Sequence, residues 1–327
     1  MGQRRALVLG AGGFIGTHLV RRLKAEGAYV RGIDLRHPAF SSSPADDFRI
    51  GDLRDRETAE AALTGDIDEV YQLAADMGGA GYVFTGRHDA EIMSNSAAIN
   101  LNVLHALRAR PAGRVFFASS ACVYPVRNQA DPRDPRTAES SAYPAEPDSE
   151  YGWEKLFAER LYAAHARNCG MTVRMARYHN IYGPEGAWTG GREKAPAALC
   201  RKVAECVDGG IVRIWGDGLQ TRSFLYIDDC IDATLALMRS EHAGPFNIGS
   251  EELVSIAALA MTIAEIAGKR ITLVHEDGPV GVRGRTSDNR LVRESIRWEP
   301  AWTLRAGLDV TYRWVADQVA GHAAPAS

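Results

Sequence analysis

The feature that most constrains the fold is a set of three glycines, Gly10, Gly13 and Gly16, spaced three residues apart near the N-terminus. They follow the apolar run 6–9 and precede the segment 17–26, in which apolar residues recur at the spacing of a helix. A glycine-rich turn between a strand and a helix brings backbone N–H groups and the positive helix end to one place, where a pyrophosphate can approach. The sequence therefore predicts a dinucleotide-binding strand–turn–helix unit.

Asp34 indicates which dinucleotide this unit binds. It ends the next apolar run, 29–33, eighteen residues after Gly16. A carboxylate at this position accepts hydrogen bonds from ribose hydroxyls, which favours NAD. Arg36 is placed to hold a 2′-phosphate instead, so NADP stays a minor alternative. A structural turn followed by a surface aspartate is the other interpretation, and the complete strand–turn–helix context disfavours it.

Alternating strands and helices continue along the first half of the chain. Apolar runs at 69–75 and 114–118 read as strands, with a helical segment at 95–109 between them. This alternation predicts βαβ units and hence an α/β fold, a Rossmann-type doubly wound parallel sheet. The segment 128–150, rich in Pro, Asp and Ser, predicts a loop before a helix over 151–167.

Shorter elements fill the second half and predict a smaller α/β substrate domain. We expect an NAD-binding domain over 1–176, with contributions from about 217–245, and a substrate domain over 177–327. The ligand would lie between the two, beyond the carboxyl ends of the strands. The expected elements of the second half are a helix at 195–206, a strand at 212–215, a helix at 228–238 and a final helix near 304–319.

Composition narrows the class of protein. The 327 residues are 46% hydrophobic and 24% charged, as in soluble globular proteins, and the net charge of −3 gives no reason to expect nucleic acid or a membrane as partner. No apolar run reaches the ~18–20 residues that span a bilayer. Without a secretory signal or metal-type cysteine spacing, a reduced, cytoplasmic protein is expected. Four of the five cysteines are expected to be packed in or beside helices: Cys169, Cys200, Cys206 and Cys230.

Tyr151 and Lys155 form a candidate hydride-transfer pair. Four residues apart, they lie on one face of a helix. Removing hydride from an alcohol requires a base, and free tyrosine has a pKa near ~10. A nearby ammonium and the positive nicotinamide stabilise phenolate, and Ser120 would hydrogen-bond the same hydroxyl and orient it. This spacing alone is common on helix surfaces, but its place after the cofactor motif favours catalysis.

The glycine spacing, together with segments 51–53, 73–75, 119–120 and 151–155, resembles the extended short-chain dehydrogenase/reductase superfamily. The resemblance implies that two residues border the adenine and that two others line the cofactor channel. The two channel residues are equally compatible with an ordinary role in the core of the strand. The adenine pair is Asp52 and Leu53, and the channel pair is Leu73 and Ala75. The complete NAD set is Gly10, Gly13, Phe14, Ile15, Gly16, Asp34, Asp52, Leu53, Leu73, Ala75, Tyr151 and Lys155.

The residues after Ser120 favour epimerisation. A 4,6-dehydratase of this superfamily would carry an acidic pair there, whereas this chain has Cys122. Oxidising C4 of a hexose to a ketone acidifies the protons on C3 and C5, so a base and an acid on opposite faces can invert those centres. A thiol and a partly buried lysine can both be tuned for such transfers. Cys122 and Lys194 are the candidates; for Cys122 the alternative is a small buried hydrophobe.

Seven further segments make the resemblance specific, since they resemble the GDP-mannose 3,5-epimerase family in order along nearly the whole chain. The resemblance implies that Tyr151 exchanges the C4 hydroxyl proton, Cys122 acts as base and Lys194 as acid. The segments are 75–79, 119–125, 144–147, 179–184, 190–197, 215–224 and 281–285.

The same resemblance implies a set of residues that hold the GDP-sugar. A diphosphate requires cations, and Lys202, Arg222, Arg283 and Arg285 supply them from three segments. Any one of these alone would be more typical of a solvated surface. The implied substrate set is Gly78, Ser120, Ala121, Cys122, Asn180, Glu193, Lys194, Ala195, Lys202, Gln220, Thr221, Arg222 and Arg285.

The chain departs from the family at Ala80, where the family has methionine, and the following segment 82–91 is longer and more polar. This loop should approach the sugar, so both products stay open: GDP-L-galactose by inversion of C3 and C5, or GDP-L-gulose by inversion of C5 alone. The alternatives are a 4-epimerase on the same scaffold and a non-catalytic NAD-binding regulator. A homodimer is expected by analogy with the superfamily.

Overall fold

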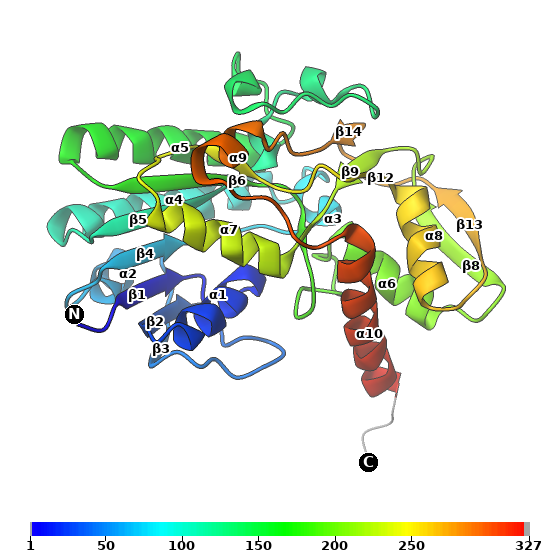
Figure 1. Ribbon diagram of the computed structural model, residues 1–327, viewed down its shortest axis with the longest axis horizontal. Helices are drawn as coiled ribbons and strands as arrows, with labels where there is room; N and C mark the ends of the chain where they lie inside the picture. The colour runs from blue at the N-terminus through cyan, green and yellow to red at the C-terminus, as the bar shows by residue number, and fades with distance from the viewer. Residues whose placement is uncertain (1, 324–327) are drawn as a thin grey trace.

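The computed structural model describes residues 2–323 and is built on a central seven-stranded sheet (Figure 1). Every neighbouring pair in this sheet is parallel. The predicted Rossmann-type α/β fold is confirmed. In spatial order the strands are β11 (Phe246–Ile248), β6 (Val173–Tyr178), β5 (Arg114–Ser120), β4 (Glu69–Gln72), β1 (Arg5–Leu9), β2 (Tyr29–Asp34) and β3 (Asp47–Ile50).

Helices cover both faces of this sheet (Figure 1). Successive residues of β1 point to opposite faces, so Ala6 and Val8 join one apolar cluster and Leu7 and Leu9 join another. A parallel strand covered on both sides needs apolar residues on both. One cluster includes residues of α1 (Phe14–Ala25) and α7 (Ile227–Arg239); the other includes residues of α2 (Arg56–Ala62), α4 (Asp89–Ala109) and α5 (Glu150–Cys169).

The second half adds three small sheets beside the central one. Two are two-stranded and parallel, β8 with β13 and β7 with β10; in the third, β9 lies between β12 and β14. The strands are β7 (Ile181–Tyr182), β8 (Gly210–Trp215), β9 (Thr221–Ser223), β10 (Leu225–Tyr226), β12 (Leu253–Ser255), β13 (Ile271–Glu276) and β14 (Gly284–Arg285). The remaining α-helices are α3 (Ala80–Val83), α6 (Ala195–Glu205), α8 (Ile256–Ile266), α9 (Arg290–Ile296) and α10 (Leu304–Ala323).

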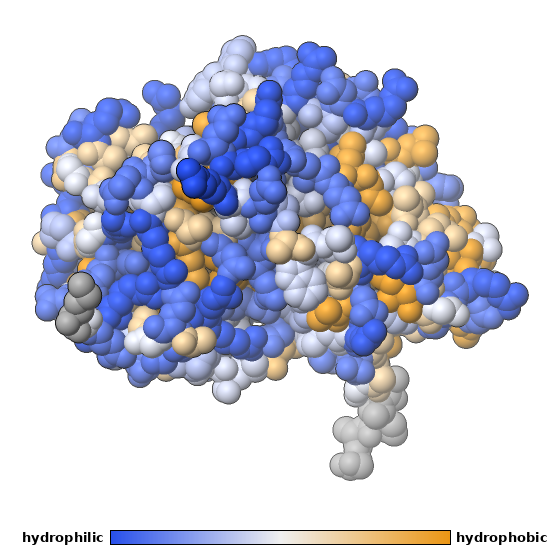
Figure 2. Space-filling view, viewed as in Figure 1, coloured by the Kyte–Doolittle hydropathy of each residue, from blue (hydrophilic) through white to orange (hydrophobic). Residues whose placement is uncertain are grey.

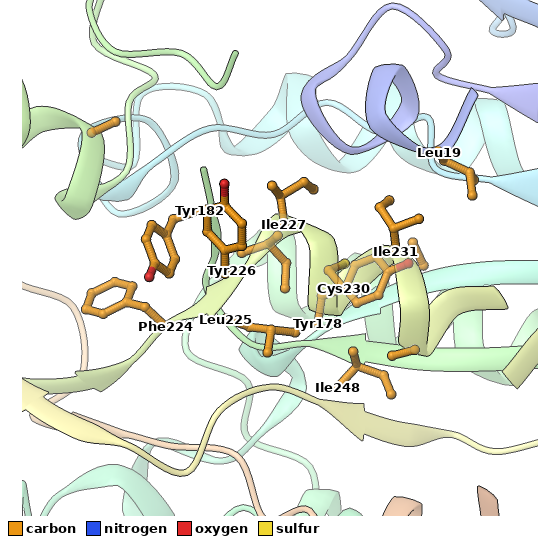
Figure 3. Close-up of a cluster of buried hydrophobic side chains, with 14 of the residues drawn as sticks. Leu19, Tyr178, Tyr182, Phe224, Leu225, Tyr226, Ile227, Cys230, Ile231 and Ile248 are labelled. Atoms are coloured by element: carbon orange, nitrogen blue, oxygen red, sulfur yellow. The ribbon is translucent and has the colours of Figure 1, made fainter. Parts of the chain in front are cut away.

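One apolar core connects the two halves. Figure 3 shows Leu19 of α1, Tyr178 of β6 and Ile231 of α7 in one cluster with Tyr182 of β7 and Phe224, which precedes β10. The same cluster continues into the helices of the second half, including Leu199 of α6 and Leu259 of α8. Because this core is continuous, the groups carried by the two halves are held in fixed relative positions.

Two surface properties follow from the remaining residues. Figure 2 shows apolar side chains over the part of the molecule where Figure 1 places α8, β8 and β13; Ile211, Leu219 and Met261 are exposed there. Within residues 2–323, no helix has the length and apolar character needed to cross a membrane.

Several expected boundaries are wrong. The strand expected over 69–75 ends at Gln72, whose side-chain amide bonds to both the N–H and the carbonyl of Ala74 and turns the chain out of the sheet. The helix expected from residue 95 begins at Asp89, which places two carboxylates in its first turn, where the helix dipole favours them. Cys169 at the end of α5 is exposed, not packed.

Candidate active site

The glycine turn has the geometry that the sequence predicts. Gly10 has a left-handed φ of +87°, and a Cβ there would lie 2.9 Å from the backbone nitrogen of Ala74. A Cβ on Gly16 would overlap the carbonyl oxygen of Gly10. Glycine is therefore required at both positions, because the turn between β1 and α1 folds tightly against its neighbours.

Gly13 leaves room for a ligand at the start of α1. It is the N-cap residue of that helix, and no side chain in the described part of the chain caps the helix. A Cβ on Gly13 would meet only the carbonyl oxygen of Gly10, at 3.3 Å, so the space beside the helix end is not filled by protein. Phe14 and Ile15 are the first two residues of the helix. This end of α1, with its unused N–H groups, fits the pyrophosphate of a dinucleotide.

Asp34 closes the same turn at the end of β2. Its carboxylate accepts hydrogen bonds from the backbone nitrogens of Gly12, at 3.0 Å, and Arg36, at 3.2 Å. Burial raises the pKa of Asp34, and these hydrogen bonds oppose the rise. The carboxylate therefore lies where the ribose of a nucleotide on the glycine turn would reach it, and the two residues expected at the adenine, Asp52 and Leu53, follow β3.

Leu73 and Ala75 follow β4, the strand next to β1, and both are partly buried. The nitrogen of Leu73 bonds to the carbonyl of Leu9, which ends β1 beside the glycine turn. They therefore follow the point between β1 and β4 where the strand order reverses, and ligands of open α/β sheets bind at such a point.

Tyr151 and Lys155 lie on the first two turns of α5, and both side chains are buried. Ser149 caps this helix by accepting a hydrogen bond from the nitrogen of Gly152, at 3.2 Å. The Lys155 ammonium lies 5.7 Å from the centre of the Tyr151 ring and donates to the carbonyl of Ala118 in β5, at 3.0 Å. The hydrogen bond to β5 and the shared position on α5 therefore fix the Tyr151–Lys155 pair relative to the sheet.

Burial dominates the titration of both groups. It raises the pKa of Tyr151 well above the ordinary value, with smaller contributions from Cys122 and Glu154, while a hydrogen bond with Ser120 opposes the rise. Burial lowers the pKa of Lys155, and the carboxylate of Glu154 opposes that change. The phenol is therefore protonated in the protein alone, and further positive charge is needed before Tyr151 can act as a base.

Cys122 and Lys194 come from different halves of the chain and interact electrostatically. Cys122 lies in a 3₁₀ turn, Ala121–Val123, directly after β5, and its nitrogen donates to the hydroxyl of Ser120, at 3.2 Å. Lys194 is the N-cap residue of α6. Burial lowers the pKa of Lys194, and its interaction with Cys122 opposes this change. Cys122 therefore contributes to the electrostatic surroundings of Lys194.

Arg285 contacts Cys122 directly and is also held by two residues that the sequence did not reveal, Gln129 and Asp148. Its Nη1 donates to Cys122 Sγ at 3.3 Å, its Nε to Gln129 Oε1 at 2.6 Å, and its Nη2 to the carboxylate of Asp148. Arg285 and Asp148 are both almost completely buried, with 5% and 2% of their side chains exposed. Gln129 and Asp148 lie in the predicted loop 128–150, where no local pattern distinguishes them from surface residues.

The other expected cations have different surroundings. Arg222 of β9 donates to the carbonyls of Thr221, Val280 and Val282. Burial and nearby Arg285 lower its pKa to about 9. A partly buried guanidinium bonded to carbonyls is an electrostatically favourable place for an anion. Of the remaining two, Lys202 donates to the carbonyl of Arg213 at 2.7 Å, and Arg283 is 41% exposed and pairs with Asp217 at 3.0 Å.

Five further substrate candidates lie on the second half. Asn180 has a left-handed φ of +48° and donates to the carbonyl of Ser223, at 2.8 Å. Gln220 is buried and its Oε1 has no partner among the described residues. Thr221 donates to the carbonyl of Pro132, Glu193 accepts from the nitrogen of Gly191 at 2.7 Å, and Ala195 is the first residue of α6.

Two loops meet beside these groups. The nitrogen of Gly79 donates to the carbonyl of Arg192 at 3.0 Å, and a Cβ on Gly79 would overlap the carbonyl oxygen of Glu193. The Arg192 guanidinium lies 4.0 Å from the centre of the Tyr82 ring, and buried Gly78 packs against Tyr82. The loop with the departure from the family is therefore docked directly on the segment that holds Lys194.

Within residues 2–323, no group of three or more His, Cys, Asp and Glu residues is arranged to hold a metal ion. The groups gathered around Tyr151 and Cys122 are acids, bases and cations.

Comparisons with known proteins agree with this geometry. The model of the NAD dependent epimerase/dehydratase family matches residues 6–249. GDP-mannose 3,5-epimerase of Arabidopsis thaliana is 43% identical over 314 residues, covering 95% of this chain and 82% of the plant protein. The dTDP-4-dehydro-6-deoxy-D-allose reductase of Streptomyces bikiniensis is 32% identical over 324 residues, covering 95% of this chain and 96% of the reductase.

Two solved structures share the fold over nearly the whole chain. UDP-glucose 4-epimerase of Thermotoga maritima with UDP-glucose superposes with a TM-score of 0.85 at 25% identity, covering 96% of this chain and 99% of that one. The Thermus thermophilus UDP-glucose 4-epimerase in complex with NAD gives a TM-score of 0.80 at 25% identity, covering 95% and 98%.

Proposed function

This chain belongs to the NAD-dependent epimerase/dehydratase family, and from that premise we propose that it epimerises GDP-α-D-mannose at C5, or at C3 and C5, through transient oxidation at C4. Inversion of C5 alone gives GDP-L-gulose, and inversion of both centres gives GDP-L-galactose. The 43% identity to plant GDP-mannose 3,5-epimerases supports this choice of substrate over that of the structurally similar 4-epimerases.

The observation that carries the proposal is the grouping of Cys122 and Lys194 around the Tyr151–Lys155 pair. Cys122 packs against the apolar cluster that contains Tyr151 and Tyr82, and the Tyr82 ring lies 4.0 Å from the guanidinium of Arg192, two residues before Lys194. Inversion at C4 alone needs only the Tyr151–Lys155 pair. Inversion at a neighbouring carbon needs an additional base and an additional acid.

NAD would be held by the glycine turn and Asp34, and when bound it supplies the acceptor that takes hydride from C4 and later returns it. Tyr151 takes the C4 hydroxyl proton, with its phenolate stabilised by the ammonium of Lys155. The resulting ketone acidifies C3 and C5. Cys122 removes a proton from one face, and Lys194 returns one to the opposite face. Tyr151 then gives its proton back to the C4 oxygen. Because the hydride taken from C4 is also returned to C4, the cycle would consume no NAD.

The nucleotide part of the substrate would be held mainly by the second half. Arg222 is the cation best suited to the diphosphate, because it is partly buried and, among the described residues, its hydrogen bonds go to carbonyls and not to a carboxylate. Gln220 offers a donor on the substrate a buried oxygen that has no partner within residues 2–323. In this assignment residues 1–176, with about 217–245, bind NAD, and residues 177–327 bind the GDP-sugar. The other proposed substrate contacts are Gly78, Ser120, Ala121, Asn180, Glu193, Ala195, Lys202, Thr221 and Arg285.

The test is to incubate the purified protein with NAD and GDP-α-D-mannose in deuterated water and to follow the sugar by NMR. Deuterium at C5, with or without C3, and no net NADH is the expected result. The ratio of C3 to C5 labelling identifies the dominant product. Inversion of C4 without deuterium at C3 or C5 would identify a 4-epimerase, and no reaction with bound cofactor would contradict the proposed substrate.

A further inference from the structure

The guanidinium of Arg285 is held from three directions. Its strand, β14, belongs to the second half, but the partners of its Nε, Nη1 and Nη2 are Gln129, Cys122 and Asp148 of the first half. Gln129 is itself fixed, since its amide nitrogen donates to the carbonyl of Tyr124 at 3.0 Å. A planar guanidinium with three directed hydrogen bonds has one orientation, so the bond to Cys122 Sγ has one direction.

Asp148 connects this guanidinium to the helix of the hydride-transfer pair. One carboxylate oxygen accepts from Arg285, and the other accepts from the hydroxyl of Ser149, at 2.8 Å. Ser149 is the N-cap residue of α5, which carries Tyr151 in its first turn. Separating Arg285 from Asp148 would leave a buried charge uncompensated, which is costly. We therefore expect the ion pair to persist in the folded protein.

Several elements present charged or titratable groups to Cys122. They are Tyr151 from α5, Lys194 at the start of α6, Arg222 from β9, Arg285 from β14 and Asp148 from the segment before α5. Burial raises the pKa of Cys122, Asp148 raises it further, and Arg285 lowers it. Asp148 therefore offsets the charge of the arginine while holding it on the sulfur.

We propose that Asp148 is a positioning residue for proton removal from the sugar: its carboxylate holds Arg285 against Cys122 and thereby fixes the direction in which the sulfur faces the substrate. The inference rests on the proposed function, in which Cys122 is the base. Asp148 acts through Arg285 and does not contact the reacting carbon. In this proposal the main role of Arg285 is to hold Cys122 Sγ, and Arg222 is the main cation for the diphosphate.

Asp148→Asn tests this role, because it keeps the side-chain shape and removes the charge. We expect deuterium incorporation at C5 of GDP-mannose to fall about tenfold or more, while KM changes less than about threefold. The transient NADH absorbance that reports oxidation at C4 should keep its wild-type amplitude. Unchanged incorporation, or an equal loss of oxidation and incorporation, would overturn the proposal. If Asp148→Asn does not fold, Asp148→Glu replaces it with the same expectations, and wild-type incorporation in that variant overturns the proposal.

A second measurement needs no substrate. The rate at which iodoacetamide alkylates Cys122, followed by mass spectrometry of its peptide, gives the pH at which the thiol ionises. Asp148→Asn should move this midpoint to lower pH by about half a unit or more, and Arg285→Gln should move it to higher pH. An unchanged midpoint in Asp148→Asn would overturn the proposal.

The control is Asp47→Asn, which removes another arginine-paired carboxylate, 2.8 Å from Arg31, and should leave the midpoint unchanged. The two measurements also separate the two proposals. A wild-type protein that labels no carbon of GDP-mannose contradicts the proposed function, while the alkylation midpoint still decides the role of Asp148.

Discussion

Two kinds of proton transfer are assigned to different side chains in this site. Tyr151, which lies on α5 with Lys155, is proposed to serve the oxygen on C4, whereas Cys122 follows β5 and Lys194 is the N-cap residue of α6. Because these groups come from separate elements, each can be removed without displacing the others. Single substitutions therefore distinguish oxidation at C4 from inversion at its neighbours.

Cys122→Ala and Lys194→Ala should lower deuterium incorporation at C3 and C5 by about 10²–10⁴-fold, while transient NADH still forms. Tyr151→Phe should suppress both NADH formation and deuterium incorporation, since oxidation at C4 precedes every later step. Stopped-flow absorbance and NMR on the same samples check the prediction. Normal labelling by Cys122→Ala would show that another group is the base.

His179 should make the protein less stable in mild acid. It is fully buried, with Nε2 hydrogen-bonded to Asn247 Oδ1 at 2.8 Å, and burial lowers its pKa from 6.5 to about 3. Below pH 6.5 the unfolded chain binds a proton that the folded protein does not, so stability falls as pH decreases toward 3. The slope approaches about 1.4 kcal/mol per pH unit for one proton.

Urea unfolding of His179→Gln between pH 6.5 and 4 checks this prediction, because glutamine cannot take up the proton. The free energy of unfolding should depend less steeply on pH than in wild type, by almost one proton. His242→Gln is the matched control, since His242 is exposed. Equal slopes in wild type and His179→Gln would refute the assignment.

At the scale of elements, α3 and the start of α6 are held together through Gly79, the N-cap residue of α3. Gly79→Ala should prevent this docking and lower kcat/KM by about tenfold, because a misplaced loop misaligns Lys194. Thermal stability should change little, as the contact joins loops. Gly81→Ala is the matched control, since its nearest contact would be an ordinary 3.4 Å to Trp215. Equal activity of the two variants would contradict the prediction.

The sequence predicted those elements whose signal is local. The glycine turn needs a strand before it and a helix after it, and α5 shows its helical spacing over twenty residues. The small strands β12 and β14 have three and two residues, too few to show an alternating pattern. Asp148 was missed for another reason: its burial depends on Arg285, which is 137 positions away, so nothing beside it in the chain reveals its partner.

At the scale of the molecule, we propose a homodimer formed through α4 and α5. Leu101, Trp153 and Phe157 on these helices are between 42% and 50% exposed. Phe157→Glu should convert the dimer to a monomer in light scattering after size-exclusion chromatography, because burying an unpaired carboxylate is costly. Ile211→Glu, in the exposed apolar area of β8 (Figure 2), should leave the mass unchanged. A dimer that persists in Phe157→Glu but dissociates in Ile211→Glu would move the interface to β8.

The strand order also has a consequence for synthesis on the ribosome. β11 covers the outer edge of β6, yet it is translated roughly seventy residues later, which takes about 3–14 s. During that interval β6 is an open edge on a nascent chain and a template for pairing with another polypeptide. β6 carries Arg174 and Arg177, and Glu159, the partner of Arg177, has already been made. The charged side chains of Arg174 and Arg177 thus disfavour pairing of β6 with another polypeptide until β11 has been synthesised.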